Sequence, residues 1–158
     1  MGKKTSQEID MNKFANVQNN TLYWLLLYNQ VLNRKYPLLK NFGDTMRLRR
    51  SDIQDVMTNS RELFEEGYAI ILDDEEFVEH LGLSNIYKYV VKSKKEIDNL
   101  LSSSEEQITE FYNNAPRGIK ELIFLACIEM IEKGDSAIDS LSKQKFLEKL
   151  FGRKLARE

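Results

Sequence analysis

The chain has 158 residues, a formal net charge of −2, 42% hydrophobic residues and 30% charged residues. This balance is typical of one globular domain, and a chain of this length needs neither a metal nor a disulfide to hold its core. A single cysteine and a single histidine exclude an internal disulfide and a zinc site of the cysteine and histidine type.

Residues 1–20 are polar and predict an N-terminal arm without the apolar stretch of a secretion signal. Residues 1–6 match the myristoylation pattern, but that pattern is short and occurs often by chance. The apolar run from Leu22 to Tyr28 is far shorter than the ~20 residues that span a membrane. We therefore expect a soluble, cytoplasmic protein with no membrane partner.

A helix is predicted from about Thr21 to Lys35, where Tyr36-Pro37 ends it because the residue before a proline avoids the helical region. Two of its turns are apolar on nearly all sides. Such a helix lies at the centre of a core or in an interface. After a loop, alternating polar and apolar residues predict a short strand over 45–49.

The next helix is predicted over residues 51–66. Ser51 and Gln54 form a capping box at its start, and a break is expected near residues 58–60. Gly67 is expected to cap its end. Residues 68–72 follow as the best strand candidate in the chain, because they are apolar and rich in isoleucine.

Most of the remaining chain predicts helices, although residues 86–91 are ambiguous between helix and strand. An acidic helix starts at Asp73 or Asp74, and capping boxes open further helices at Ser93 and Ser104. Pro116 opens a strongly apolar helix that reaches about Lys133, and a last short helix starts near Ser142.

These elements predict a mainly α-helical protein, a single-domain multi-helix bundle with at most one or two short strands, around 45–49 and 68–72. The helical domain is expected over 21–152, between the N-terminal arm and a basic tail over 153–158. Its core is expected to centre on Trp24, Leu27, Val31, Leu122, Leu125, Ile128 and Ile131.

No constellation of residues indicates catalysis. His80 is the only imidazole, and its helical neighbours Glu76 and Glu79 are better explained as parts of an exposed acidic helix than as metal ligands. No glycine-rich phosphate loop is present, and Cys127 lies in an apolar helix where a thiol is inert. We expect no enzymatic activity, cofactor, metal or small-molecule substrate.

Charge is segregated along the chain. Residues 34–50 are strongly basic, residues 62–79 are acidic throughout, and the stretch from Lys143 is basic again. The helix 51–66 is long enough, at about 1.5 Å per residue, to hold the first two blocks more than about 20 Å apart. We therefore expect a molecule with opposite charge on opposite faces and salt-dependent association with a partner.

The leading hypothesis is a non-enzymatic protein–protein interaction module: an assembly subunit, adaptor or regulator whose partners are other subunits or a second copy of itself. Aromatic and arginine side chains are enriched at interface hot spots. The candidate partner-binding residues are Tyr23, Trp24, Tyr28, Tyr36, Arg47, Arg49 and Arg50. The abundance of lysine, asparagine and isoleucine is typical of an AT-rich genome and hints at a phage origin.

The alternative hypothesis is a nucleic-acid-associated regulator that uses the basic segments 34–50 and 143–157. The predicted order of elements over 45–72 follows the outline of a winged helix. However, the would-be recognition helix 61–66 carries three glutamates, which would repel phosphate. This repulsion argues against nucleic acid as the partner.

Overall fold

The computed structural model describes residues 9–155, so the myristoylation pattern, the start of the arm and the last three residues of the tail lie outside it. About half of the described residues are helical and 14% are in strands, which makes the protein a mixed α/β fold rather than a helical bundle. The elements are β1 (Phe14–Asn19), β2 (Tyr28–Asn29), β3 (Arg34–Lys35), β4 (Thr45–Arg49), α1 (Arg50–Glu65), β5 (Ala69–Leu72), α2 (Glu75–His80), α3 (Ser84–Tyr87), α4 (Lys94–Leu101), α5 (Glu105–Asn114), α6 (Arg117–Glu132), the 3₁₀ helix η1 (Ser136–Ile138) and α7 (Leu141–Phe151).

The prediction of a helical bundle is wrong because part of the expected arm is the central strand of a sheet. β1 pairs antiparallel with β4 on one side and with β5 on the other, giving the order β4-β1-β5. The two strands expected from the sequence, around 45–49 and 68–72, are both present as the neighbours of β1.

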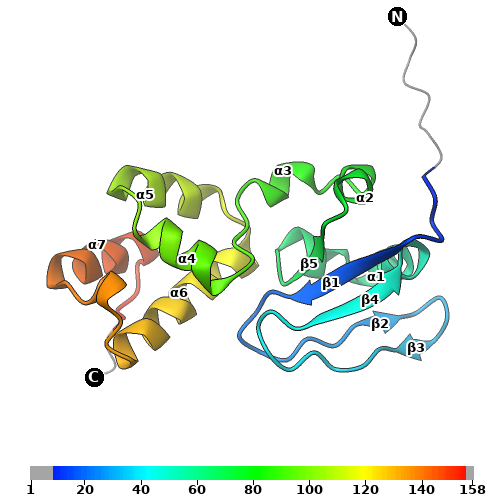
Figure 1. The fold of residues 1–158 in the computed structure, drawn as a ribbon, viewed down its shortest axis with the longest axis horizontal. Coiled ribbons are helices and arrows are strands. Elements are labelled where there is room, and N and C mark those ends of the chain that lie inside the picture. The colour runs from blue at the N-terminus through cyan, green and yellow to red at the C-terminus, as the bar shows by residue number, and fades with distance from the viewer. Residues whose placement is uncertain (1–8, 156–158) are drawn as a thin grey trace, which may run out of the picture.

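The sheet separates two apolar cores, because successive side chains of a strand point to opposite faces. In β5, Ala69 and Ile71 belong to one core, and Ile70 belongs to the other. The first core lies between the sheet and α1, whereas the second is formed by helices α4 to α7. Figure 1 shows this division, with the sheet and α1 at one end of the molecule and α4 to α7 at the other.

Buried amide side chains join the two halves. The Gln18 amide donates a hydrogen bond to the Lys92 carbonyl at 2.7 Å, and the Asn20 amide donates to the Val91 carbonyl at 2.9 Å. Asn19, also buried, donates to the carbonyls of Tyr23 and Leu39. Because a buried amide is costly unless it is hydrogen-bonded, these contacts fix the position of β1 against the segment that leads into α4.

The helix predicted over 21–35 is not formed. Residues 25–29 instead run antiparallel to residues 34–39, through the Leu25–Leu39 bridge and the short strands β2 and β3. The two segments form a hairpin whose turn includes Asn33, which has a φ of 50°. Near this turn, the side chain of the buried Asn29 accepts a hydrogen bond from the Leu32 N–H. A short apolar run fits a strand as well as a helix, and here the turn residues and the packing against α1 select the hairpin.

The structure confirms most of the predicted helix starts. Ser104 and Gln107 form a reciprocal capping box, and Ser93 accepts a hydrogen bond from the Glu96 N–H. The box predicted at Ser51 is wrong, since β4 runs directly into α1 and Arg49 occupies the capping position. The predicted break in that helix is present as a kink at Ser60.

The expected core is only partly correct. Leu27 and Leu122 are fully buried, and Leu125, Ile128 and Ile131 are partly buried against the second core. Trp24 and Val31 are instead 69% and 61% exposed, because they lie in the hairpin segment and not in a central helix. Among residues 9–155, we find no helix with the length and apolar character required to cross a bilayer.

Candidate functional site

The hairpin segment 23–32 presents an apolar outer surface to solvent. Its residues alternate, so Leu25 and Leu27 point into the first core while Trp24, Leu26 and Tyr28 point outward. Six of the eight large hydrophobic side chains that are exposed among the described residues come from this one segment. We call this surface the hairpin face; its members are Tyr23, Trp24, Leu26, Tyr28, Val31 and Leu32.

The hairpin face is held in place from beneath. Asn29 donates hydrogen bonds to the Tyr36 hydroxyl and to Asp55 of α1, both at 3.2 Å. Leu25, Leu27 and Tyr36 pack in the core that α1 shares with the sheet. A rigid support of this kind lowers the entropic cost of presenting exposed apolar side chains to a partner.

A basic groove lies beside the hairpin, along the outer edge of β4. Arg47 and Arg49 extend over the Phe14 ring, with their guanidinium carbons 4.7 Å and 5.3 Å from its centroid. Arg34, from the hairpin, also lines the groove, and its guanidinium carbon lies over the Tyr36 ring, 5.3 Å from the centroid. The groove has a volume of about 340 Å³, and Asp52 is the one acidic residue among the described residues that line it.

Two of the residues expected to bind a partner are buried. Tyr36 is 4% exposed and packs in the first core. Arg50 is 3% exposed and forms a two-pronged ion pair with Asp74, at 2.7 Å and 2.9 Å, which raises the pKa of the guanidinium. These two side chains are nearly inaccessible to solvent, whereas Tyr23, Trp24, Tyr28, Arg47 and Arg49 are all exposed.

The same ion pair corrects the expectation that the two charge blocks lie apart. Helix α1 runs away from the basic block, but β5 returns in the opposite sense and brings Asp74 back to the start of α1. Glu76 also approaches Arg50, at 3.5 Å. The blocks therefore meet at Arg50, and the other basic residues of the first block stay exposed.

His80 stands apart from any acid–base or metal cluster. It is exposed at the end of α2 and stacks on Phe77, with the ring centroids 6.4 Å apart. Glu76 contacts Arg50 rather than His80. Within residues 9–155, no group of three histidine, cysteine or acidic side chains is arranged to hold a metal ion.

Cys127 is fully buried in the second core, and burial raises the pKa of its thiol to about 12. A thiol in such an environment stays protonated and is a poor nucleophile. Residues 73–75, with Lys88 and Lys92, line a separate pocket of mixed charge. Tyr87 lies beside it, and its hydroxyl accepts a hydrogen bond from the Ile71 N–H.

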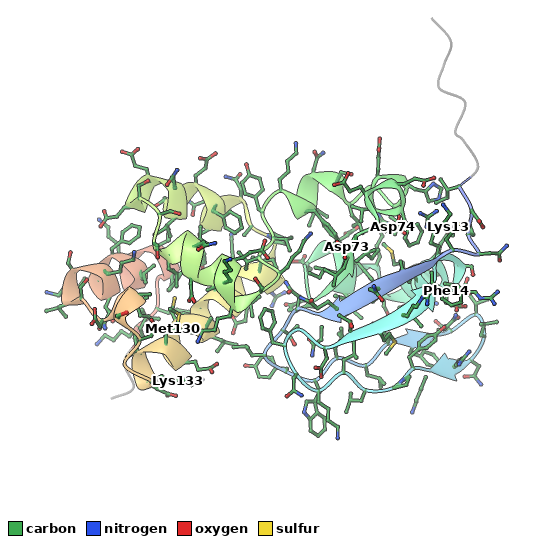
Figure 2. All side chains as sticks on the ribbon, in the orientation of Figure 1. Lys13, Phe14, Asp73, Asp74, Met130 and Lys133 are labelled. Atoms are coloured by element: carbon green, nitrogen blue, oxygen red, sulfur yellow. The ribbon has the colours of Figure 1, made fainter. Side chains whose placement is uncertain are left out.

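An apolar pocket of about 210 Å³, which no sequence pattern predicted, lies between the two halves of the molecule. Leu22 and Phe42 from the first half meet Ile97 and Met130 from the second. These residues are too far apart in sequence to form a recognisable motif. Figure 2 shows Met130 and Lys133 in the helical half and Phe14 at the far end of the sheet, so this pocket is distinct from the basic groove.

No protein-family model matches the chain, and neither the curated proteins nor the solved structures compared with it include a match. The residues above are therefore the whole basis for assigning a function.

Proposed function

We propose that this chain is a non-enzymatic protein–protein interaction module and that the hairpin face is the surface on which its partner docks. The observation that carries the proposal is the concentration of exposed apolar side chains in one short segment. Contiguous apolar surface on a soluble domain marks interaction sites, and tryptophan and tyrosine dominate their energetics. The partner is another protein subunit or a second copy of this chain.

The remaining features support the same proposal. Cys127 is buried and His80 lies outside any cluster, so neither offers a poised catalytic group. The single unpaired cysteine suits a reducing compartment, which supports a cytoplasmic location. Adaptor, assembly and regulatory roles all fit such a module.

The nucleic-acid alternative receives less support. Its two basic segments lie at opposite ends of the molecule, with β3 and β4 at one end and α7 at the other, so they form no continuous track for a phosphate backbone (Figure 1). Within the second segment, Arg153 pairs with Glu121 at 3.2 Å and lies over the Phe124 ring, which reduces its availability to phosphate.

The test compares the wild-type chain with the double variant Trp24→Ser/Leu26→Ser. Light scattering on a size-exclusion column reports self-association, and affinity capture from a cell extract reports other partners. We expect a stoichiometric complex, with itself or with another protein, that the double variant loses while its circular dichroism and melting temperature stay unchanged. Lys40→Ser, an exposed position outside the hairpin face, is the control and should retain the complex.

The single tryptophan supplies a direct readout. Trp24 is 69% exposed, so its fluorescence should shift to the blue when a partner covers it. The proposal would be refuted by three results together. The wild-type chain would be monomeric, it would capture the same proteins as the double variant, and its Trp24 emission would not shift when those proteins are added.

A further inference from the structure

The outer edge of β4 is an unpaired sheet edge. The Arg50 N–H donates to the Lys13 carbonyl, and the Asn19 N–H donates to the Asp44 carbonyl. In an antiparallel pair every second residue is hydrogen-bonded to the neighbouring strand, so the backbone groups of Met46 and Leu48 face β1. It follows that the N–H and C=O groups of Thr45 and Arg47, and the N–H of Arg49, point away from β1. Among the described residues, none of these groups has a hydrogen-bond partner within the chain.

The groove places cations beside these free backbone groups. Arg47 and Arg49 are two residues apart on one strand, so their side chains extend from the same face of the sheet, about 7 Å from each other along the strand. Arg34 adds a third guanidinium to the lining of the groove. Within residues 9–155, none of these three arginines forms an ion pair with a carboxylate.

We propose that the groove along the edge of β4 binds an extended, acidic segment of a partner protein, which adds to the sheet as a further strand. Main-chain hydrogen bonds to Thr45, Arg47 and Arg49 would supply affinity, as in other complexes formed by strand addition. Carboxylates at every second position would meet Arg47 and Arg49 and supply specificity. This inference rests on the proposed function, since it names the chemistry of the partner at the groove that adjoins the hairpin face.

The groove suits a peptide better than a nucleic acid. Its one exposed aromatic ring, Phe14, already carries the guanidinium groups of Arg47 and Arg49 against it, so it is not open for a base to stack on. The unpaired backbone groups of β4, in contrast, are complementary to another strand and not to phosphate.

The probe for the experiment is a fluorescein-labelled peptide of alternating glutamate and valine, about six residues long, which is the length of a typical strand. Binding to the full chain is followed by fluorescence anisotropy. We expect saturable binding that weakens about tenfold in Arg47→Gln/Arg49→Gln and weakens again as salt rises from about 50 to 300 mM. Both arginines are exposed, so the variant should fold, which its melting temperature checks.

The matched control is Lys35→Gln/Lys40→Gln, which removes the same charge from exposed positions nearby that do not line the groove. It should change the affinity less than about twofold. An equal loss in both double variants would mean that the peptide senses only the general positive field, and this result would overturn the proposal. Failure of the peptide to bind the wild-type chain would overturn it as well.

Two further peptides, N-methylated on every glutamate or on every valine, test strand pairing. Only one set of N–H groups faces β4, so one peptide should lose binding and the other should keep it. In an antiparallel pair, the glutamates opposite Arg47 and Arg49 direct their own N–H groups toward β4, so methylation of the glutamates would block binding. In a parallel pair, the valines between them direct their N–H groups toward β4, so methylation of the valines would block binding. Equal behaviour of the two peptides would overturn strand addition, and tighter binding of an oligothymidylate of equal charge would overturn the choice of a peptide.

The outcome is separable from that of the proposed function. Trp24 does not line the groove, so Trp24→Ser/Leu26→Ser should bind the acidic peptide as the wild type does. Loss of the complex in that variant with intact peptide binding is the expected result. Retention of the complex in that variant with intact peptide binding refutes the hairpin face alone. Loss of the complex together with an absence of peptide binding to the wild type refutes the groove alone.

Discussion

Arg50 shows how neighbouring residues of one kind acquire different roles. Arg47 and Arg49 alternate outward from β4, whereas Arg50 begins α1 and turns inward to Asp74. There it also donates to the Asp10 carbonyl and lies over the Phe77 ring. The three arginines look equivalent in the sequence, but Arg47 and Arg49 are exposed cations, whereas Arg50 forms a buried ion pair that supports the fold.

Replacing Arg50 should destabilise the fold. Arg50→Met leaves the Asp74 carboxylate largely buried without its cation, a change that typically costs about 3–5 kcal/mol. Arg49→Met, at an exposed position, should cost less than about 0.5 kcal/mol. Urea unfolding measures both, and similar values for the two variants would contradict a structural role for the ion pair.

Cys127 should make stability depend on pH in the alkaline range. The pKa of its thiol is about 12 in the folded chain and about 8.5 in an unfolded one, so the unfolded state loses the proton first as the pH rises. The free energy of unfolding should therefore fall by up to about 1.4 kcal/mol per pH unit above about pH 9 from this group alone.

The variant Cys127→Ala isolates that contribution. Tyr87, whose pKa burial also raises to about 12, acts in both proteins and only above about pH 10. Between about pH 9 and 10, urea unfolding should show a steeper decline in the wild type than in the variant. Parallel curves would mean that the thiol is accessible to water in the folded state.

At the scale of the element, the position of α6 depends on one close approach. The Gly118 N–H donates to the Glu66 carbonyl at 2.6 Å, and a Cβ at this position would lie 2.3 Å from that oxygen and 2.9 Å from the Tyr68 ring. Gly118 is helical, so conformational freedom does not explain it, and the requirement is for space. The contact fixes the start of α6 against the turn that leads into β5.

Gly118→Ala should therefore be destabilising, although alanine favours helix more than glycine does by about 1 kcal/mol. The helix must shift or the hydrogen bond must break, and overpacking of this kind costs about 1–3 kcal/mol or more. Lys145→Ala, at an exposed position of α7, is the control. A Gly118→Ala protein as stable as the wild type in thermal unfolding would show that the start of α6 can move freely.

Helices with local start signals were predictable, and the hairpin was not. Ser93 and Ser104 cap helices through residues three positions away, so a short window of sequence contains the whole signal. The run from Leu22 to Tyr28 has no polar residue to mark which side faces water. Its alternation of exposed and buried positions arises only from packing against α1 and from the pairing with residues 34–39.

At the scale of the molecule, three arginines of the basic block line the groove beside the hairpin face. Arg50 is neutralised by Asp74, so Arg34, Arg47 and Arg49 supply the field that an acidic partner would meet. Charges at the rim of an interface act mainly on the rate of association. These charges are therefore suited to steer an acidic partner toward the proposed docking site.

Arg47→Glu/Arg49→Glu should slow association with the partner about tenfold or more at low salt without unfolding the chain. Arg50 is left unchanged, because its replacement would destabilise the fold instead of testing the surface. Stopped-flow fluorescence of Trp24 measures the rate from about 50 to 500 mM salt, over which the Debye length falls well below 10 Å. A rate that is independent of salt would mean that these charges do not steer the partner.

The sequence by itself determined the local features of this protein: the strands around 45–49 and 68–72, most of the helices after residue 93 and the burial of Cys127. Only the tertiary structure decided the fold class, because β1 is polar and its amides can be buried only where the carbonyls of Val91, Lys92 and Leu39 reach them. Only the tertiary structure separated Arg50 and Tyr36 from the exposed candidates. The fold class and the burial of Arg50 and Tyr36 both depend on contacts between residues distant in sequence, and a local sequence pattern carries no information about such contacts.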